Sequence, residues 1–207
     1  MDKKDFLFRF VPGVQRAKIQ LDDEALYSTT DQLTADKISR NLCKLFSSID
    51  NIIITDATAC IGGSAYSLSK CFPRVNAIEL DESRYRLLVH NIKLLGASNV
   101  ICSQGDAVEL CKTFQQDMIF IDPPWGGPEY KTRQRVTLEL SNKNISQVCI
   151  ELAPFTKYIA LKVPTNFDEI RFHEETKEIL VNVLRDIHLR KMNLLVFKVK
   201  ENTKEEE

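Results

Sequence analysis

The chain has 207 residues, of which 43% are hydrophobic and 28% are charged, and its formal net charge is −1. This length and balance suit one globular domain and exclude a disordered or fibrous chain. No apolar run reaches membrane-spanning length, and the first ten residues lack the apolar core of a signal peptide. We therefore expect an intracellular protein, in the nucleus or the cytoplasm, that makes no membrane contact.

The six cysteines, at positions 43, 60, 71, 102, 111 and 149, include no Cys-x-x-Cys pair. Zinc sites and disulfide frameworks usually show such close spacing. We therefore expect buried, reduced thiols and no bound metal.

Basic residues gather in three places although the net charge is almost zero. They lie in the N-terminal arm, after residue 130 and in the C-terminal segment: Lys3, Lys4, Arg9, Arg16, Lys18, Lys131, Arg133, Arg135, Arg185, Arg190 and Lys191. An acidic tail over residues 201–207 offsets them in the sum. The pattern is compatible with a local phosphate-binding face.

Residues 1–28 look irregular, with a turn at Pro12–Gly13. A helix is expected over about residues 30–49, because apolar residues recur there at helical spacing and Thr30 followed by Asp31 suits an N-cap. Short apolar runs then predict strands that end at Asp56 and over residues 75–80, 99–103, 118–121 and 158–163. Helices are expected up to about residue 72, over 82–95 and over 145–155.

The chain closes on two β-rich runs, residues 179–189 and 193–199, which predict an antiparallel hairpin. Strands that alternate with helices and end in a hairpin indicate an α/β fold. We expect a Rossmann-like, mostly parallel sheet with an antiparallel C-terminal hairpin. In such sheets ligands bind beyond the carboxyl ends of the strands, so the residues after each strand are candidates for a site.

The first three strand ends predict a cofactor that contains a nucleoside. Asp56 is followed by a small-residue loop that reaches Gly62–Gly63, where the backbone can approach a ligand closely. Glu79 ends the second strand, where a carboxylate can bind a ribose diol. Gly105–Asp106 after the third strand suits contact with an adenine amino group. Each signal is weak alone, but their occurrence at the ends of three successive strands favours a cofactor that contains a nucleoside.

The fourth strand is followed by the block Asp-Pro-Pro-Trp-Gly-Gly-Pro-Glu-Tyr, residues 122–130. Asp122 and the carbonyl of Pro123 can accept the two hydrogens of an exocyclic amine, and Pro124 stiffens the turn. Trp125 offers a stacking surface for a purine, with added cation–π attraction for a positively charged ring. The competing interpretation is a rigid proline loop around a core tryptophan.

The block from Asp122 to Tyr130 resembles the signature of trimethylguanosine synthases, which methylate N2 of the 7-methylguanosine RNA cap. The loop from Asp56 to Gly63, the segment from Leu21 to Thr30, and Pro164-x-Asn166-x-Asp168 are similar to other motifs of that family. The resemblance spans about residues 19–170. It implies a class I methyltransferase that uses S-adenosylmethionine, acts on capped RNA, needs no metal and is expected to be a monomer.

The resemblance also implies roles for individual positions. Cofactor contacts are expected from Thr30, Asp56, Ala59, Gly62, Glu79, Leu80, Asp106, Ala107 and Asp122. The amine would be oriented by Asp122, Pro123 and Pro124. Substrate contacts are expected from Trp125, Lys162, Asn166, Arg9, Arg16 and Lys18. The expected organisation is an N-terminal arm over residues 1–29 with cap or RNA contacts, a methyltransferase domain over 30–200 and the acidic tail over 201–207.

Two positions depart from the family pattern. Cys60 stands where the family often has glycine, which puts the path of the loop in question, and Thr165 replaces a residue that is commonly basic. Cap-phosphate binding would then fall to Lys162 or to the arm. The long N-terminal extension of many members has no counterpart, so a minimal catalytic unit is expected.

Several other functions stay open at this point. One is a base-amine methyltransferase for guanine N2 or adenine N6 in other RNA or DNA. Another is ribose 2′-O methylation through an Asp–Lys pair such as Asp122 and Lys162, which the rigid Pro123–Pro124 turn disfavours. A non-catalytic cap-binding subunit is the third, and the intact set of acidic strand-end residues argues against it.

Overall fold

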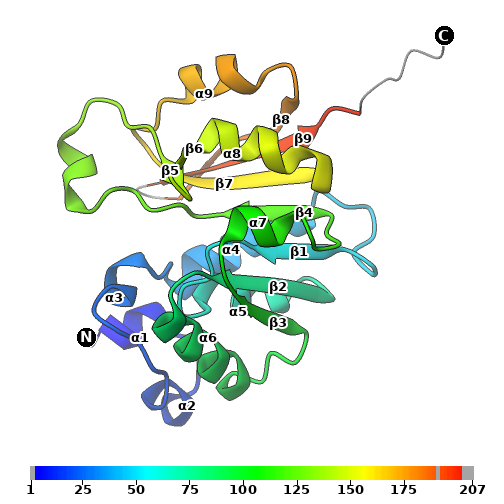
Figure 1. The fold of residues 1–207 in the computed structure, drawn as a ribbon. Helices are drawn as coiled ribbons and strands as arrows, with labels where there is room; N and C mark the ends of the chain where they lie inside the picture. Colours follow the sequence, from blue (N-terminus) through cyan, green and yellow to red (C-terminus); the bar gives the residue numbers. More distant parts are fainter. Residues whose placement is uncertain (1–2, 190–191, 202–207) are drawn as a thin grey trace.

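The computed structural model describes residues 3–189 and 192–201. Its centre is a seven-stranded sheet in the order β3-β2-β1-β4-β7-β9-β8 (Figure 1). The first five strands pair in parallel, and β9 pairs antiparallel with both β7 and β8. The strands are β1 (Ile53–Asp56), β2 (Arg74–Glu79), β3 (Val100–Gln104), β4 (Met118–Ile121), β7 (Tyr158–Pro164), β8 (Leu180–His188) and β9 (Met192–Val199). The expected α/β sheet with an antiparallel C-terminal hairpin is confirmed.

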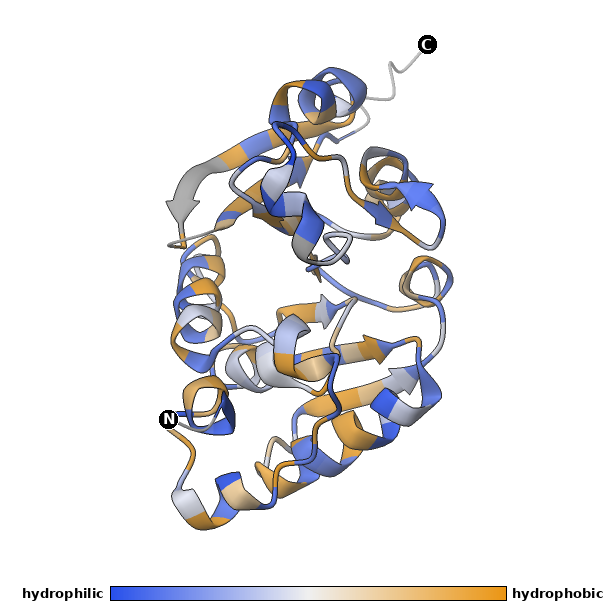
Figure 2. Cartoon of the chain, turned by 90° about the vertical axis from the view of Figure 1, so that its left-hand side faces the viewer, coloured by the Kyte–Doolittle hydropathy of each residue, from blue (hydrophilic) through white to orange (hydrophobic). Residues whose placement is uncertain are grey.

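Helices cover both faces of this sheet. One face carries α4 (Gln32–Cys43), α5 (Gly63–Ser69) and α6 (Glu82–Leu94), and the other carries α7 (Ala107–Cys111), α8 (Ile145–Leu152) and α9 (Glu169–Thr176). Each face therefore has its own apolar core, the first around Leu68 and Leu88 and the second around Val148 and Leu161. Figure 2 shows the apolar residues concentrated on the strands and on the inner helix stripes.

The central strands are continuous apolar runs because both of their faces are buried. All four residues of β4 are fully buried. The five parallel strands begin and end within one or two residues of their predicted ranges. The hairpin β8–β9 also lies where it was expected, although residues 190–191 of its turn lie outside the described residues.

The helix predicted over residues 30–49 is shorter than expected. It begins at Gln32, and its N-cap is Asp31, whose Oδ1 accepts a hydrogen bond from the Thr34 N–H at 3.2 Å. The prediction of Thr30 as part of the cap is wrong, because the Thr30 hydroxyl donates to Asp122 instead. The helix ends at Cys43, well before the expected residue 49.

The arm is more regular than the sequence indicated. It contains α1 (Lys3–Leu7), α2 (Gly13–Ala17) and α3 (Ala25–Ser28). Leu7, Phe8, Val11 and Ile19 form a small third core with Ile61 of the fold. These helices have only four or five residues, too few to show a helical period in the sequence. The division between residues 1–29 and 30–200 stays a prediction.

Other short elements were also missed. They are α7, α9, the 3₁₀ helices η1 (Pro128–Thr132) and η2 (Ala153–Phe155), and the small hairpin of β5 (Glu139–Leu140) and β6 (Lys143–Asn144). The helix expected over 145–155 ends at Leu152 and tightens into η2 beside Pro154. Within the described part of the chain, no helix combines the length and the apolar character needed to cross a membrane.

Candidate functional site

The carboxyl ends of five parallel strands meet at one edge of the sheet, on the left-hand side of Figure 1, where α3 and η1 also lie. Asp56 and Glu79 are the last residues of β1 and β2, and Asp122 follows β4 directly. Asp106 lies two residues after β3 and is the N-cap of α7. The structure thus brings the four acidic residues predicted from the strand ends to a common edge.

Asp56 is fully buried, and only one of its two carboxylate oxygens has a hydrogen-bond partner among the described residues. Its Oδ1 accepts a hydrogen bond from the Thr58 N–H at 3.3 Å, whereas Oδ2 has no partner among the described residues. The pKa of this carboxyl is raised to about 7, mainly by burial and to a smaller extent by the negative charges of Asp122 and Glu79, while the hydrogen bond from Thr58 opposes the rise. An unsatisfied carboxylate oxygen at such a site suits a ligand that carries an N–H group or a positive charge.

The loop after Asp56 is tightly closed against the arm. Gly62, the N-cap of α5, has φ = +97°, which favours glycine. A Cβ on Gly63 would lie 2.7 Å from Cγ2 of Thr29, so only glycine fits there. Cys60 adopts φ = +50° and therefore keeps the left-handed path that a glycine would take. A narrow cleft results, lined by Ser28, Thr29, Thr30, Thr58, Ala59, Cys60, Gly63, Ser64 and Asp122.

The ends of β2 and β3 offer polar groups beside an exposed apolar side chain. Burial raises the pKa of Glu79, and its Oε1 accepts a hydrogen bond from the Asp81 N–H at 2.9 Å. Leu80 is 62% exposed. Asp106 Oδ1 accepts the N–H groups of Val108 and Glu109, so one of its oxygens serves the start of α7, and Ala107 is buried there.

Asp122 lies at the centre of a polar network. Its Oδ2 receives the Lys162 ammonium at 2.5 Å and the Thr30 hydroxyl at 3.3 Å, and its N–H donates to Oγ1 of Thr58. Burial raises the pKa of Asp122, and the charge and hydrogen bond of Lys162 oppose that rise. The Lys162 side chain is only 5% exposed. Its ammonium is therefore committed to Asp122, away from the surface where the sequence suggested a phosphate contact.

Trp125 lies against the same ammonium. The Lys162 Nζ is 5.0 Å from the centroid of the indole, and the ring of Tyr130 meets the indole edge-on at 5.1 Å. The buried indole N–H has no partner among the described residues. Gly126 and Gly127 have φ of +80° and +73° and open space at their Cα atoms. Pro123 is buried beneath this turn, and Pro124 is exposed.

The side-chain amide of Asn166 is engaged by the backbone of the η1 segment. Its amide donates to the carbonyls of Tyr130 at 2.9 Å and Arg133 at 2.8 Å, so it fixes the η1 segment to the loop after β7. Sequence reasoning missed this structural task. It also passed over Thr58 and Tyr130 as individual residues, although both lie inside the two blocks that carried the signal.

The three arm cations expected to contact the substrate, Arg9, Arg16 and Lys18, have contacts within the arm or lie beside α6. Arg16 forms an ion pair with Asp5 and donates to the carbonyls of Arg9 and Val11. The Arg9 guanidinium lies over the ring of Phe6. The neighbouring Gln15 bonds the carbonyl of Leu94, at the last turn of α6, and the carbonyl of Lys18 contacts His90 in the same helix. Arg16 and Lys18 thus follow the flank of α6.

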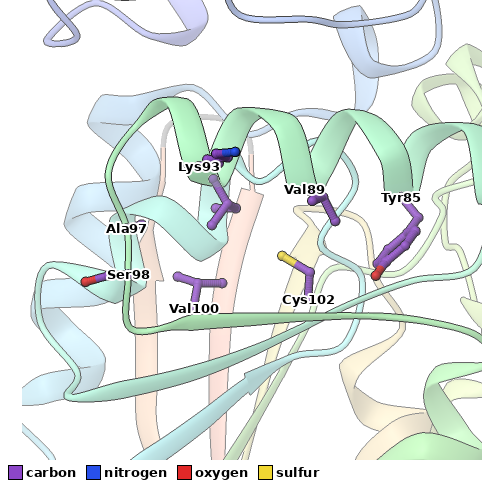
Figure 3. Close-up of a pocket in the computed structure, with 8 residues that line it drawn as sticks. Tyr85, Val89, Lys93, Ala97, Ser98, Val100 and Cys102 are labelled. Atoms are coloured by element: carbon purple, nitrogen blue, oxygen red, sulfur yellow. The ribbon is translucent and has the colours of Figure 1, made fainter.

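A second cleft of about 350 Å³ lies between α6 and the edge strand β3, lined by Tyr85, Val89, Val100 and Cys102 among others (Figure 3). None of the residues predicted for the site lines it. Among residues 3–189 and 192–201, no group of three or more histidine, cysteine or acidic side chains is placed to hold a metal ion.

Comparison with known proteins adds to this geometry. Residues 51–205 match the family described as RNA cap guanine-N2 methyltransferase. An uncharacterized protein of Acanthamoeba polyphaga mimivirus is 32% identical over 94% of this chain and 85% of its own length. The trimethylguanosine synthase of Schizosaccharomyces pombe is 30% identical over 72% of this chain, and the match covers 64% of the yeast protein.

Solved structures agree on the fold. A candidate RNA methyltransferase from Pyrococcus horikoshii superposes with a TM-score of 0.63 at 14% identity, covering 96% of this chain and 98% of its own. At this identity the likeness shows the fold alone, which is that of class I methyltransferases.

Proposed function

The chain belongs to the RNA cap guanine-N2 methyltransferase family, and we propose that it transfers a methyl group to the exocyclic N2 of 7-methylguanosine RNA caps. The observation that carries the proposal is the junction of Asp122 and Trp125 after β4. There a buried carboxylate and an aromatic face lie side by side around one ammonium, as an amine on a flat base requires.

S-adenosylmethionine is the methyl donor of this fold and family, and it supplies an electrophilic methyl group on a sulfonium. The residues present fit it. The free Oδ2 of Asp56, with Thr30, Ala59 and Gly62 around the cleft, would hold the methionine part. Glu79 would bind the ribose hydroxyls. Leu80, Asp106 and Ala107 would surround the adenine, for which the exposed Leu80 offers an apolar surface.

Asp122 and the Pro123 carbonyl accept the two N–H bonds of the guanine amine. The amine is a poor nucleophile because its lone pair is delocalised into the ring, and hydrogen bonds to a carboxylate raise its electron density. Lys162 keeps Asp122 ionised and fixes its orientation. Trp125 stacks on the cationic 7-methylguanine and holds N2 in line with the methyl group.

Proton release follows from the same arrangement. As the N–C bond forms and the S–C bond breaks, the nitrogen becomes more acidic. Asp122 accepts the released proton or passes it to water. The histidines take no part in this scheme, because none is found among the described side chains that line the cleft.

Ribose 2′-O methylation is the second candidate, and one observation favours it. The Asp–Lys pair that such chemistry uses is formed here by Asp122 and Lys162. A ribose hydroxyl would need neither the buried Pro123 turn nor the aromatic surface of Trp125, so the base amine remains the better fit. Methylation of amines in uncapped RNA or DNA, and cap binding without catalysis, are separated by the same experiment.

The test is methyl transfer from labelled S-adenosylmethionine to a 7-methylguanosine cap analogue, an unmethylated guanosine cap and uncapped RNA. Mass spectrometry of the nucleosides locates and counts the methyl groups. Transfer to N2 of the 7-methylated cap alone is the expected result. Methyl groups on O2′ or on uncapped RNA would refute the proposal. Cofactor binding without transfer to any acceptor would indicate a binding subunit.

A mutation tests the stacking role. Trp125→Ala is expected to weaken binding of the cap analogue by about tenfold or more, because base–aromatic stacking contributes about 1–3 kcal/mol. Affinity for S-adenosylhomocysteine, measured by calorimetry, should change by less than about twofold. Phe155→Ala, which removes a half-exposed aromatic ring elsewhere on the surface, is the matched control. Unchanged cap affinity in Trp125→Ala would remove the stacking assignment.

A further inference from the structure

A short run of exposed cations leads away from Trp125. Lys131, Arg133 and Arg135 follow Tyr130 at alternate positions, and all three are exposed. We call residues 131–135 the basic segment. Residues 129–135 contain these three positive charges and a single negative charge, that of Glu129. The concentration of charge is therefore local, in a chain whose net charge is close to zero.

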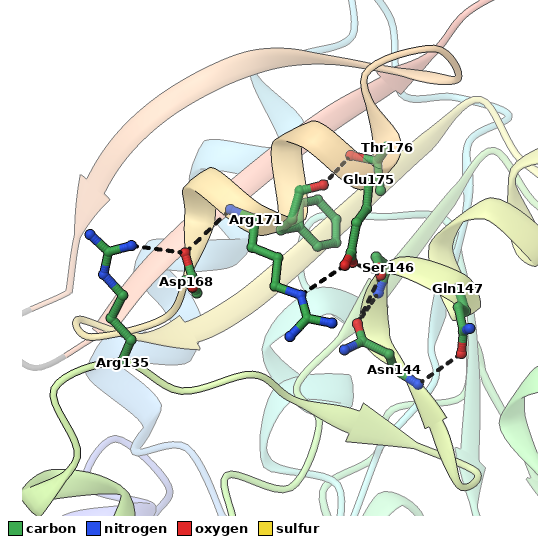
Figure 4. Close-up of polar contacts among 9 residues, drawn as sticks. Arg135, Asn144, Ser146, Gln147, Asp168, Arg171, Glu175 and Thr176 are labelled. Carbon is green, nitrogen blue, oxygen red and sulfur yellow. Dashed lines mark hydrogen bonds and ion pairs between the residues drawn. The ribbon is translucent and has the colours of Figure 1, made fainter.

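The side chains of the basic segment make few and weak contacts with the rest of the protein. Arg135 is 62% exposed, and its ion pair with Asp168 is long at 3.6 Å (Figure 4). Asp168 also caps α9 by accepting the Arg171 N–H, so its charge is shared. No ion pair or hydrogen bond of the Arg133 guanidinium is recorded among the described residues. The Lys131 ammonium lies 5.8 Å from the centroid of the Tyr130 ring.

The backbone of the segment, in contrast, is firmly held. Asn166 donates to the carbonyls of Tyr130 and Arg133. Val136 pairs with Phe167, and the Val136 N–H donates to the carbonyl of Asn166 at 3.0 Å. The loop after β7 thus fixes the main chain and leaves the cationic side chains outside. Ligand binding then orders side chains only, which lowers its entropic cost.

The segment is also continuous with the proposed base site. Tyr130, its immediate predecessor, packs edge-on against Trp125. A polyanion that extends from a base stacked on Trp125 would therefore meet Lys131, Arg133 and Arg135 in turn. Arginine suits phosphate because its planar fork donates two parallel hydrogen bonds.

We infer that the basic segment binds phosphates of the RNA chain that follows the cap, and so makes long capped RNA a better substrate than the cap alone. The inference rests on the proposed function. The phosphate chemistry has two sources, the bridging phosphates of the cap and the phosphodiester backbone beyond it. We assign the segment to the backbone, because its three cations extend over five residues away from Trp125.

The test compares two substrates and two triple variants. The substrates are a 7-methylguanosine cap dinucleotide and a capped RNA of twelve nucleotides. The test variant is Lys131→Ser/Arg133→Ser/Arg135→Ser. The control, Lys93→Ser/Lys157→Ser/Lys177→Ser, removes the same charge from exposed positions beside the amino ends of strands or at a helix end. Equal melting temperatures would show that both variants are folded.

For the twelve-nucleotide RNA, the test variant is expected to raise KM about tenfold or more and to lower the slope of log K against log salt by about 2, because about 0.7 counterions are released per phosphate contact. The kcat and the KM for the dinucleotide should change less than about twofold. Equal losses on both substrates would assign the segment to the cap phosphates and overturn the inference. Equal behaviour of the two variants would do the same.

Direct binding separates this inference from the proposed function. Fluorescence anisotropy of the labelled twelve-nucleotide RNA, capped and uncapped, reports the segment even if no methyl group is transferred. Weaker RNA binding by the test variant in an inactive protein would support the segment and reject the activity. Normal cap methylation by the wild type, together with RNA binding that is unchanged in the test variant, would support the proposed activity and reject the role of the basic segment.

Discussion

Lys162 touches both groups on which the proposed chemistry depends. Its ammonium bonds Asp122 and lies 5.0 Å from the centroid of the Trp125 indole. The charge of Asp122 in turn helps to raise the pKa of Asp56 at the same edge. Lys162 is therefore a positioning residue that keeps the carboxylate of Asp122 charged although other acidic residues lie at the same edge.

Lys162→Met should shift the acid limb of the pH–kcat profile upward by about one unit or more, since removal of the positive charge raises the pKa of Asp122 further. Activity lost at the lower end of the profile should return in part as the pH is raised. Lys162→Arg should keep the wild-type profile. A loss of kcat that is the same at every pH would contradict this role, and would fit the instability of about 3–5 kcal/mol that an unpaired buried charge causes.

Asp56 gives a second prediction at this scale, on cofactor affinity. With a pKa of about 7, its carboxyl is largely protonated at pH 6 and largely ionised at pH 7.5. If the anion holds the methionine ammonium, the dissociation constant of S-adenosylhomocysteine should fall about eightfold over this range. Calorimetry would measure it. Asp56→Asn should bind weakly with little pH dependence, and a wild-type response in this variant would refute the assignment.

At the scale of elements, the loop between β1 and α5 carries a residue in an unfavourable conformation. Cys60 holds φ = +50°, where a side chain costs about 1–2 kcal/mol and glycine costs almost nothing. The loop therefore keeps the left-handed conformation that a glycine would adopt, and the cysteine at position 60 causes backbone strain there.

Cys60→Gly and Cys60→Ala remove the same thiol and differ only in this backbone cost. Cys60→Gly should be more stable than Cys60→Ala by about 1 kcal/mol in denaturant unfolding. Both lose the contact of the thiol with the Thr29 hydroxyl at 3.8 Å, so that contact cancels in the comparison. Equal stability of the two variants would mean that the left-handed conformation is not maintained.

Long elements with one clear pattern were predictable, and short ones were not. The central parallel strands read as apolar runs because helices cover both of their faces. The β5–β6 hairpin was missed because its turn, Ser141–Asn142, has positive φ at both residues without the glycine that usually marks it. The short helices of the arm could not be predicted, because their burial depends on partners elsewhere in the chain, such as Ile61.

The same distinction holds for the site. Strand ends could be located from the sequence, so Asp56, Glu79 and Asp122 were found together. The contacts of Asn166 could not be found in this way, because its amide bonds backbone carbonyls of the η1 segment, a pairing that depends on tertiary geometry. The Asp122–Lys162 pair was named from the sequence only for ribose methylation, and it forms because β4 and β7 are neighbours in the sheet.

For the whole molecule, three buried carboxyls at one edge link stability to pH. Burial raises the pKa of Asp56, Glu79 and Asp122. Well below pH 3.8, the ordinary pKa of aspartate, these groups are protonated in both the folded and the unfolded state. As the pH rises, the unfolded chain releases its protons first, so stability is lost progressively, for Asp56 up to about pH 7.

For Asp56, the rise from 3.8 to about 7 corresponds to a loss of up to about 4 kcal/mol. Asp56→Asn should therefore gain stability relative to the wild type between pH 5 and pH 8. Calorimetry without cofactor would show a difference in melting temperature that widens by several degrees, at about 2–4 °C per kcal/mol. A difference that stays constant with pH would show that Asp56 is not the titrating group.

The position of β9 has a consequence for how the protein is made. This strand comes last in the sheet's chain order yet lies between β7 and β8. While the ribosome is still translating residues 192–199, the inner edge of β7 has no neighbour and β8 has no sheet to join. The nascent chain thus carries an open apolar edge until β9 has been made, and during that time it is exposed to aggregation and to capture by chaperones.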